Sequence, residues 1–330
     1  MSEPLFVHFH RSPDENVIAH LTADLSSNVQ FTFGDDPSNE SQVKVLVSGR
    51  PTAEEIDRFP LLRKLIIPWA GVPIETFALL DGRPGIDIHN LHHNAVPVAE
   101  YTLTLMLAAA KNILPMDHAL RLADWRPRYM PDTAVPLTGK TALILGYGHI
   151  GRALAKYLRA FEMKILATRN SIGLQQIEDG VSIYPSGALL SLLPEADFLV
   201  VALPHTPGTE GLIGENELAL LPKNAVLVNI GRGAIIDQAA LYDALKQRRI
   251  ASAGIDVWYN YPKDEESRAN TLPADHPFHE LDNIVMSPHR AGGLNTDDTE
   301  RLRMSHLAVL LNAEARGDEM PNRVDRAKGY

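Results

Sequence analysis

Residues 141–151 read TALILGYGHIG, an apolar run followed by glycines spaced Gly146-x-Gly148-x-x-Gly151. The run predicts a buried parallel strand, and the residues after it predict an amphipathic helix that begins near His149. In such a unit the first glycine permits a tight turn, the second lets the backbone approach a pyrophosphate, and the third lets the helix pack close to the strand. The helix N-terminus then faces the pyrophosphate with free N–H groups. The segment favours a dinucleotide site over its alternative, a purely structural glycine turn.

The composition restricts the class of protein. The chain has 330 residues, of which 45% are hydrophobic, enough for two domains with separate cores. Its net charge of -10 argues against a nucleic-acid or membrane-surface partner. The sequence has no cysteine, which excludes disulfides, a cysteine nucleophile and a cysteine-built metal site. No signal peptide is recognisable, and the longest apolar stretch (103–110) is too short to span a bilayer. We expect a soluble cytoplasmic protein.

Predicted strands and helices alternate along the chain, which indicates the α/β class with parallel sheets covered on both faces. In the first third, strands with amphipathic helices between them predict a small doubly wound, flavodoxin-like domain, which has no glycine fingerprint. Its predicted strands are residues 5–8, 29–33, 43–48, 64–68 and 86–89. A helix from residue 98 to about 112 follows, and it is apolar nearly all round. Such a helix must be buried, either in the core or against a second copy of the chain.

The second predicted domain has six strands, the number of a complete dinucleotide-binding sheet. They are residues 142–145, 164–168, 198–202, 225–230, 252–256 and 284–286. A last helix, from about 297 to 315, is expected to return to the first domain. We therefore predict a Rossmann domain (98–293) inserted into a smaller substrate-binding domain (1–97 and 294–330).

Three polar segments follow successive strands of the predicted Rossmann domain: residues 229–233, 254–257 and 287–289. The carboxyl ends of parallel strands meet at one edge, where such sheets bind ligands. The guanidinium of Arg232 suits a bidentate grip on a carboxylate, and the imidazole of His289 suits proton transfer near neutral pH. Taken singly, Arg232 is also compatible with a solvated turn, Asp256 with a cap and His289 with a structural loop. Together they predict an active site.

With these motifs in this order, the chain resembles the D-isomer-specific 2-hydroxyacid dehydrogenase family over nearly its whole length. The family includes glyoxylate/hydroxypyruvate reductases and the D-lactate, phosphoglycerate and formate dehydrogenases. Besides the fingerprint, the resemblance rests on Asn94-x-x-x-Val98-Ala-Glu100, LPHTPGT (203–209), VNIGRGAIID (228–237), GIDVW (254–258) and SPHRAGG (287–293).

The resemblance implies a role for each motif. Arg232 would hold the carboxylate and carbonyl of a 2-oxo acid, His289 would be the general acid/base, and Asp256 would lie near the nicotinamide carboxamide. The substrate would be bound by Trp69, Ala70, Gly71, Val72, Asn94, Arg232 and His289. The cofactor would be bound by Gly146, Gly148, His149, Ile150, Gly151, Thr168, Arg169, Asn170, Ser171, Leu203, Pro204, His205, Thr209, Ile230, Gly231, Arg232, Asp256, His289 and Gly292.

One departure from the family concerns catalysis. Most members carry a glutamate five residues beyond the aspartate, paired with the histidine, and here that position is Tyr261. A phenol is neutral near pH 7 and does not stabilise an imidazolium as a carboxylate does. We therefore place Tyr261 among the catalytic residues and expect that no such pair raises the pKa of His289. The substitution also leaves open a catalytically weak or repurposed protein.

A second departure concerns the cofactor. NAD-specific relatives end the second strand with an acid that binds the ribose hydroxyls. Here Thr168 takes that place, followed by Arg169, Asn170 and Ser171. An acid would repel a 2′-phosphate, whereas an arginine attracts one. This pattern predicts a preference for NADP(H), with NAD(H) as the second cofactor.

No metal site is expected. His92 and His93 are adjacent, and adjacent residues on a strand face opposite ways. No cysteine or spaced carboxylate completes a ligand set there.

The sequence thus predicts an NADPH-preferring reductase of a small 2-oxo acid, glyoxylate or hydroxypyruvate by family. Two alternatives stay open: a dehydrogenase of another acid, such as formate or a bulkier 2-oxo acid, and a nucleotide-sensing protein with little turnover. The apolar helix and the family habit predict a homodimer. In the family the region of Trp125 and Arg128 reaches across the dimer; surface packing is the alternative for these two residues.

Overall fold

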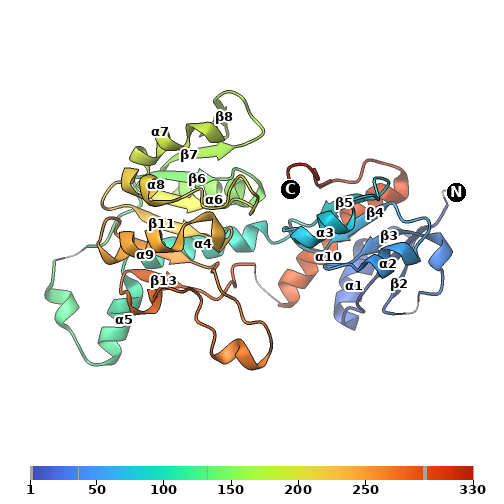
Figure 1. Ribbon diagram of the computed structural model, residues 1–330, viewed down its shortest axis with the longest axis horizontal. Helices are drawn as coiled ribbons and strands as arrows, with labels where there is room; N and C mark the ends of the chain where they lie inside the picture. The colour runs from blue at the N-terminus through green and yellow to red at the C-terminus, as the bar shows by residue number, and fades with distance from the viewer. Residues whose placement is uncertain (1–2, 36, 132, 293–295, 330) are drawn as a thin grey trace. The chain divides into compact units, whose positions relative to one another are not determined.

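The structure, a computed structural model, describes residues 3–35, 37–131, 133–292 and 296–329. The chain divides into two compact units, Met1–Asn94 with Gly293–Tyr330, and Ala95–Gly292 (Figure 1). The first division falls after Asn94, earlier than the boundary we predicted after residue 97. Gly293, at the other predicted boundary and in the last motif, lies outside the described residues.

The first unit is built on a five-stranded parallel sheet in the order β2-β1-β3-β4-β5. This order is that of flavodoxin-like folds, as predicted. All five predicted strands are present with small shifts at their ends: β1 Leu5–Phe9, β2 Val29–Phe33, β3 Val43–Val47, β4 Lys64–Ile67 and β5 Asp87–Asn90. The runs are almost continuously apolar because helices cover both faces of the sheet.

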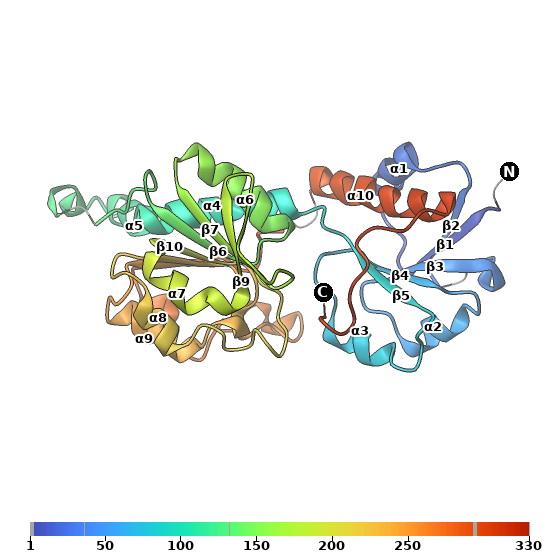
Figure 2. The ribbon, with the colours of Figure 1, turned by 90° about the horizontal axis from the view of Figure 1, so that it is seen from above.

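The helices of this unit cover the two faces in pairs. They are α1 Glu15–Asp24, α2 Ala53–Arg58, α3 Ile74–Leu79 and α10 Asp297–Arg316. Figure 2 shows α1 and α10 on one face and α2 and α3 on the other. Each pair has its own buried cluster, with Leu21 and Leu307 in one and Ile56 in the other.

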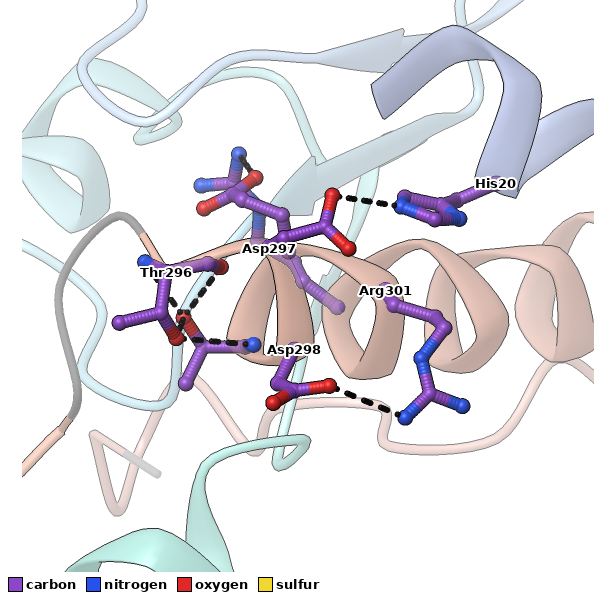
Figure 3. Close-up of polar contacts among 8 residues, drawn as sticks. His20, Thr296, Asp297, Asp298 and Arg301 are labelled. Atoms are coloured by element: carbon purple, nitrogen blue, oxygen red, sulfur yellow. Dashed lines mark hydrogen bonds and ion pairs between the residues drawn. The ribbon is translucent and has the colours of Figure 1, made fainter. Parts of the chain in front are cut away.

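Polar contacts fix the last helix to the first. Thr296 caps α10, its hydroxyl accepting from the Thr299 N–H, and His20 of α1 lies 3.0 Å from Asp297 (Figure 3). Further along, the Ser305 hydroxyl donates to the Asp24 carboxylate at 2.6 Å. The end of the chain therefore completes the core of the unit that its beginning forms.

The second unit contains an eight-stranded sheet in the order β13-β12-β11-β10-β6-β7-β9-β8. The strands are β6 Thr141–Leu145, β7 Lys164–Arg169, β8 Gln176–Glu178, β9 Val181–Pro185, β10 Phe198–Val201, β11 Val226–Asn229, β12 Ser252–Ile255 and β13 Ile284–Met286. All neighbouring pairs are parallel except β8 with β9.

Our prediction of six strands was therefore incomplete. β8 is short and mostly exposed, so it lacks the apolar pattern that identifies a strand. The missed signal is the pair Asp179-Gly180, both with positive φ (50° and 76°), which joins β8 to β9. An Asp-Gly pair between strands is typical of a tight hairpin.

Helices cover both faces of this sheet as well. They are α4 Ala95–Ala110, α6 His149–Ala160, α7 Leu189–Leu192, α8 Glu215–Leu220 and α9 Gln238–Lys246, and a further helix, α5 Ile113–Arg121, follows α4. α4 packs against α6, β11 and β12. The Ser252 hydroxyl donates to the Ala109 carbonyl at 3.0 Å, and a Cβ on Gly254 would lie 2.9 Å from the Cβ of Leu105. The apolar helix predicted over 98–112 is thus buried in its own unit, and it ends before Asn112, whose φ is 51°.

α5 differs from the other helices because none of its residues is buried. It projects away from the sheet of its unit (Figures 1 and 2). The segment after it also exposes large apolar side chains, including Leu122, Trp125 and Met130. In the part of the chain that the structure describes, no helix combines the length and apolar character needed to cross a membrane.

Candidate active site

The glycine fingerprint lies between β6 and α6, and each glycine has a different constraint. Gly146 has φ +97°, and a Cβ there would lie 2.7 Å from the Ala202 carbonyl oxygen. A Cβ on Gly151 would lie 2.5 Å from the Gly146 oxygen. Around Gly148, by contrast, no described atom lies within 4 Å of such a Cβ, and no side-chain hydrogen bond caps α6 there. The open space at an uncapped helix N-terminus fits a pyrophosphate.

The adjacent strands β10, β11 and β12 bring the predicted loops to the same edge of the sheet. A Cβ on Gly231 would lie 2.6 Å from the Leu203 oxygen, so the loops after β10 and β11 touch. Thr209 organises the first of these loops: its hydroxyl donates to the Pro204 oxygen at 2.7 Å and accepts from the Thr206 N–H at 2.8 Å. His205, at the surface of that loop, lies 3.6 Å from Glu210.

Asp256 is 1% exposed and holds the loop after β13. Its carboxylate accepts from the Ser287 hydroxyl at 2.5 Å and from the N–H groups of Arg290 and Ala291 at 2.8 and 3.0 Å. Tyr101 of α4 extends the network, with its hydroxyl 2.8 Å from that of Ser287. The structure therefore shows Asp256 positioning the segment that carries His289, a function that the sequence analysis missed. Its contact with the cofactor stays a prediction.

His289 itself has a left-handed backbone, with φ 58°. Its Nδ1 lies 3.0 Å from the hydroxyl oxygen of Tyr261, which also accepts the Trp258 N–H at 3.1 Å. The phenol donates its proton to Nδ1 when the imidazole is neutral, and its oxygen has a second lone pair that accepts from Nδ1–H when the imidazole is protonated. A neutral imidazole then carries its hydrogen on Nε2. Tyr261, which stands at the glutamate's place in the sequence, is thus a hydrogen-bond partner of the histidine in this structure.

The electrostatics of this cluster lower the pKa of His289. Partial burial among the loops is the largest cause, and the positive charge of Arg232 adds to it, while the charge of Asp256 opposes both. Burial also raises the pKa of Tyr261. Arg232 is exposed, and its guanidinium donates to the Gly231 carbonyl at 2.6 Å. The structure therefore brings Arg232, His289 and Tyr261 together.

At the end of β7, Arg169 follows Thr168 and forms an ion pair. Thr168 is buried, and its carbonyl accepts the N–H groups of Gly146 and Tyr147 at 3.3 and 3.0 Å. Arg169 donates to Glu178 at 2.8 Å and lies over the Tyr147 ring. Asn170 and Ser171 follow at the surface. Glu178 was not foreseen, because it belongs to the strand β8 that the prediction missed.

The predicted substrate residues of the first unit lie in its segments after β4 and β5. Trp69 is 39% exposed, and the Ala70 carbonyl accepts from the Asn90 amide at 2.6 Å. A Cβ on Gly49 would lie 1.9 Å from the Trp69 ring, so a larger residue there would require the ring to move. Among the described residues, the amide oxygen of Asn94 has no hydrogen-bond partner. Gly71 and Val72 continue the turn towards α3.

His92 and His93 form no metal site in the described ranges, where no group of three or more histidine, cysteine, aspartate or glutamate side chains is placed to hold an ion. Burial lowers the pKa of His93 to about 4.

Residues 103–291 match the family model for the NAD binding domain of D-isomer specific 2-hydroxyacid dehydrogenases. The chain belongs to this family. The membership inferred from the motifs is therefore confirmed, as is the two-domain α/β fold.

Relatives of this family member include two archaeal enzymes. It is 40% identical over 234 residues to a glyoxylate reductase of Aeropyrum pernix, with 69% of this chain and 66% of that protein covered. It is 31% identical over 298 residues to a D-3-phosphoglycerate dehydrogenase of Methanocaldococcus jannaschii, with 87% and 52% covered. The chain thus spans between about half and two thirds of the length of these relatives.

A solved structure has the same fold over its full length. It is the crystal structure of a D-isomer specific 2-hydroxyacid dehydrogenase from Xanthobacter autotrophicus Py2 in complex with NADPH and MES. Its TM-score is 0.81 and its identity 24%, with all of both chains covered.

The fingerprint glycines provide a matched pair of variants. Gly148→Ala adds a methyl group in open space, so we expect an unchanged melting temperature and a Kd for NADPH raised about tenfold or more. Gly151→Ala places the same methyl group against the Gly146 oxygen and should destabilise the fold by about 1–3 kcal/mol. Thermal unfolding and titration of NADPH fluorescence measure the two effects. NADPH binding by Gly148→Ala at the wild-type Kd would contradict the site.

Proposed function

We propose that this protein is an NADPH-preferring reductase of a small 2-oxo acid, forming the D-2-hydroxy acid, with glyoxylate or hydroxypyruvate as substrate. The observation that carries the proposal is the cluster of Arg232, His289 and Tyr261 beside the NAD-binding sheet. The similarity to a glyoxylate reductase supports the substrate class.

In this proposal each side chain has one task. The guanidinium of Arg232 binds the substrate carboxylate and polarises the carbonyl. Protonated His289 donates its Nε2 proton to the carbonyl oxygen as the alcohol forms. The hydride for the carbonyl carbon would come from a nicotinamide cofactor held at the glycine fingerprint. The substrate residues that the resemblance implies in the first unit, residues 69–72 and Asn94, stay part of this proposal.

The cofactor preference rests on the end of β7. A buried threonine occupies the place of the ribose-binding acid, and Arg169 follows it. A guanidinium suits a 2′-phosphate, so we propose NADPH as the preferred cofactor and NADH as the second. The Xanthobacter dehydrogenase of the same fold was crystallised in complex with NADPH, in agreement with this proposal.

The second candidate is a nucleotide-binding protein with little turnover. The observation that favours it is the phenol at Nδ1 of His289, because a neutral group does not stabilise the imidazolium. Retention of both Arg232 and His289 favours the reductase, since a binding protein has no need of a proton donor.

We further propose a homodimer formed through α5. A groove of about 1150 Å³ lies between this helix and the start of β12, lined by Met116, Leu120, Trp125 and Arg128 among others. Several large apolar side chains exposed together, as Met116, Leu120 and Trp125 are here, are typical of an interface. Trp125 and Arg128 would then contact the second subunit. The proposed location is the cytoplasm, where reduced nicotinamide cofactors are available.

The function is tested by following NADPH absorbance with a panel of 2-oxo acids and, in the reverse direction, with formate. We expect oxidation of NADPH with glyoxylate or hydroxypyruvate. His289→Ala and Arg232→Ala should each lower kcat/KM by about 10²-fold or more, since they remove the proton donor and the substrate anchor. Binding of NADPH without its consumption by any acid of the panel would favour the nucleotide-binding alternative.

The lowered pKa of His289 makes reduction pH-dependent. Only the protonated imidazole donates the proton to the substrate. Its population falls as the pH rises through the pKa, which lies below 6.5. The value of kcat/KM for reduction should therefore fall as the pH rises. Tyr261→Glu should move this fall upward by about 1–3 pH units. Tyr261→Phe, which removes the hydroxyl without adding charge, is the control. A wild-type profile that stays level to about pH 8.5 would be incompatible with this assignment.

Arg169→Ala should raise KM for NADPH about tenfold and leave KM for NADH nearly unchanged, because only the former carries a 2′-phosphate. Steady-state kinetics with each cofactor measure the change. A higher kcat/KM with NADH in the wild type would overturn the preference.

Light scattering tests the homodimer against the 36.3 kDa mass of one chain. Leu120→Asp in α5 should lower the measured mass from that of a dimer towards that of one chain, because the charge disrupts the apolar contact. Leu174→Asp, at a side chain 83% exposed elsewhere in the unit, is the control. A monomeric wild type would refute the assignment.

A further inference from the structure

One carboxylate is shared by two arginines beside the glycine fingerprint. Glu178 Oε2 lies 2.8 Å from Arg169 Nη2, and its Oε1 lies 2.7 Å from Arg152 Nε. Both guanidinium groups lie over the ring of Tyr147, at 5.3 and 5.6 Å from its centroid. Each oxygen of the carboxylate is thus occupied by a different cation.

The three charged residues come from three elements that meet at this place. Arg152 lies in the first turns of α6, Arg169 ends β7, and Glu178 ends β8. Tyr147 stands between the first two glycines of the fingerprint. The hairpin turn at Asp179-Gly180 sets the register that carries Glu178 to the arginines. The cluster therefore lies at the end of the second Rossmann strand, where the adenosine ribose is bound.

The charge of the cluster is incompletely balanced. Hydrogen bonds from Arg152 and Arg169 lower the pKa of Glu178 to about 2, so the carboxylate is ionised at neutral pH. Two cations and one anion leave an excess positive charge. All three side chains retain exposed surface, 18% for Arg169, 44% for Arg152 and 34% for Glu178, so an incoming anion has access.

We propose that Glu178 is a specificity-determining residue that competes with the 2′-phosphate of NADPH for Arg169 and Arg152. This inference rests on the proposed cofactor preference. A phosphate and a carboxylate both use the bidentate guanidinium geometry, so the two cannot hold the same N–H groups. Glu178 meets each arginine through one nitrogen, Nη2 of Arg169 and Nε of Arg152, and a 2′-phosphate that takes these nitrogens displaces the carboxylate, whereas NADH leaves the pairs intact.

The test compares two fragments of the cofactor that differ only in the 2′-phosphate. Binding of adenosine 2′,5′-bisphosphate and of 5′-AMP to the full-length protein is measured by calorimetry. Glu178→Gln should tighten the bisphosphate about five- to tenfold and leave 5′-AMP unchanged, because two partly exposed pairs no longer compete. The gain should shrink at high salt. Glu178→Ser serves as a second variant.

Glu195→Gln is the matched control. Glu195 pairs with Lys164 at 2.6 Å, and Lys164 begins the strand that Arg169 ends. This variant removes the same charge at the other end of β7 and should leave both affinities unchanged.

The outcomes separate the two proposals. If Arg169→Ala leaves the bisphosphate affinity unchanged, the proposed cofactor preference fails. If Arg169→Ala weakens it while both Glu178 variants bind as the wild type or more weakly, only the competition fails, and the carboxylate instead orients the arginines for the phosphate.

Discussion

The carboxylate of Asp256 is the constraint on which the proposed active site depends. A buried charge is costly unless hydrogen bonds satisfy it, and here the donors are the Ser287 hydroxyl and the N–H groups of Arg290 and Ala291. For these donors to reach the carboxylate, the loop after β13 must bend back towards β12. His289 lies inside this bend and takes a left-handed backbone conformation. The position of the His289 imidazole therefore follows from the hydrogen bonds that satisfy the buried Asp256 carboxylate.

Other elements strengthen the same loop from opposite sides. Tyr101 of α4 reaches the Ser287 hydroxyl, and the Trp258 indole N–H donates to the Ser287 carbonyl at 2.7 Å. With the loop held in this way, the chemistry of His289 depends on its ring neighbours. Tyr261 orients the imidazole without adding a negative charge, and the cation of Arg232 opposes protonation. The imidazole of His289 is consequently a weaker base than one that has a glutamate partner.

Much of the fold was predictable because the pattern is local. Continuous apolar runs identified the strands of both sheets, and the glycines identified the turn before α6. The hairpin of β8 and β9 was missed because β8 is short and mostly exposed. Because β8 was missed, its residue Glu178, the partner of Arg169, was missed as well. The function of Asp256 was also missed, because its donors lie more than thirty residues away in the chain.

The sequence by itself determined the family, the α/β class and the strand ends that carry Arg232 and His289, since these follow from residue type and spacing along the chain. Only the tertiary structure decided the partners of these groups. Tyr261 meets Nδ1 of His289 because the loops that carry them follow β12 and β13, which are adjacent in the sheet. Glu178 contacts two arginines because β9 pairs with β7 and the hairpin brings β8 back beside it. Hydrogen bonds and charge pairs act through space, so the pKa of a side chain is set by neighbours that spacing alone does not reveal.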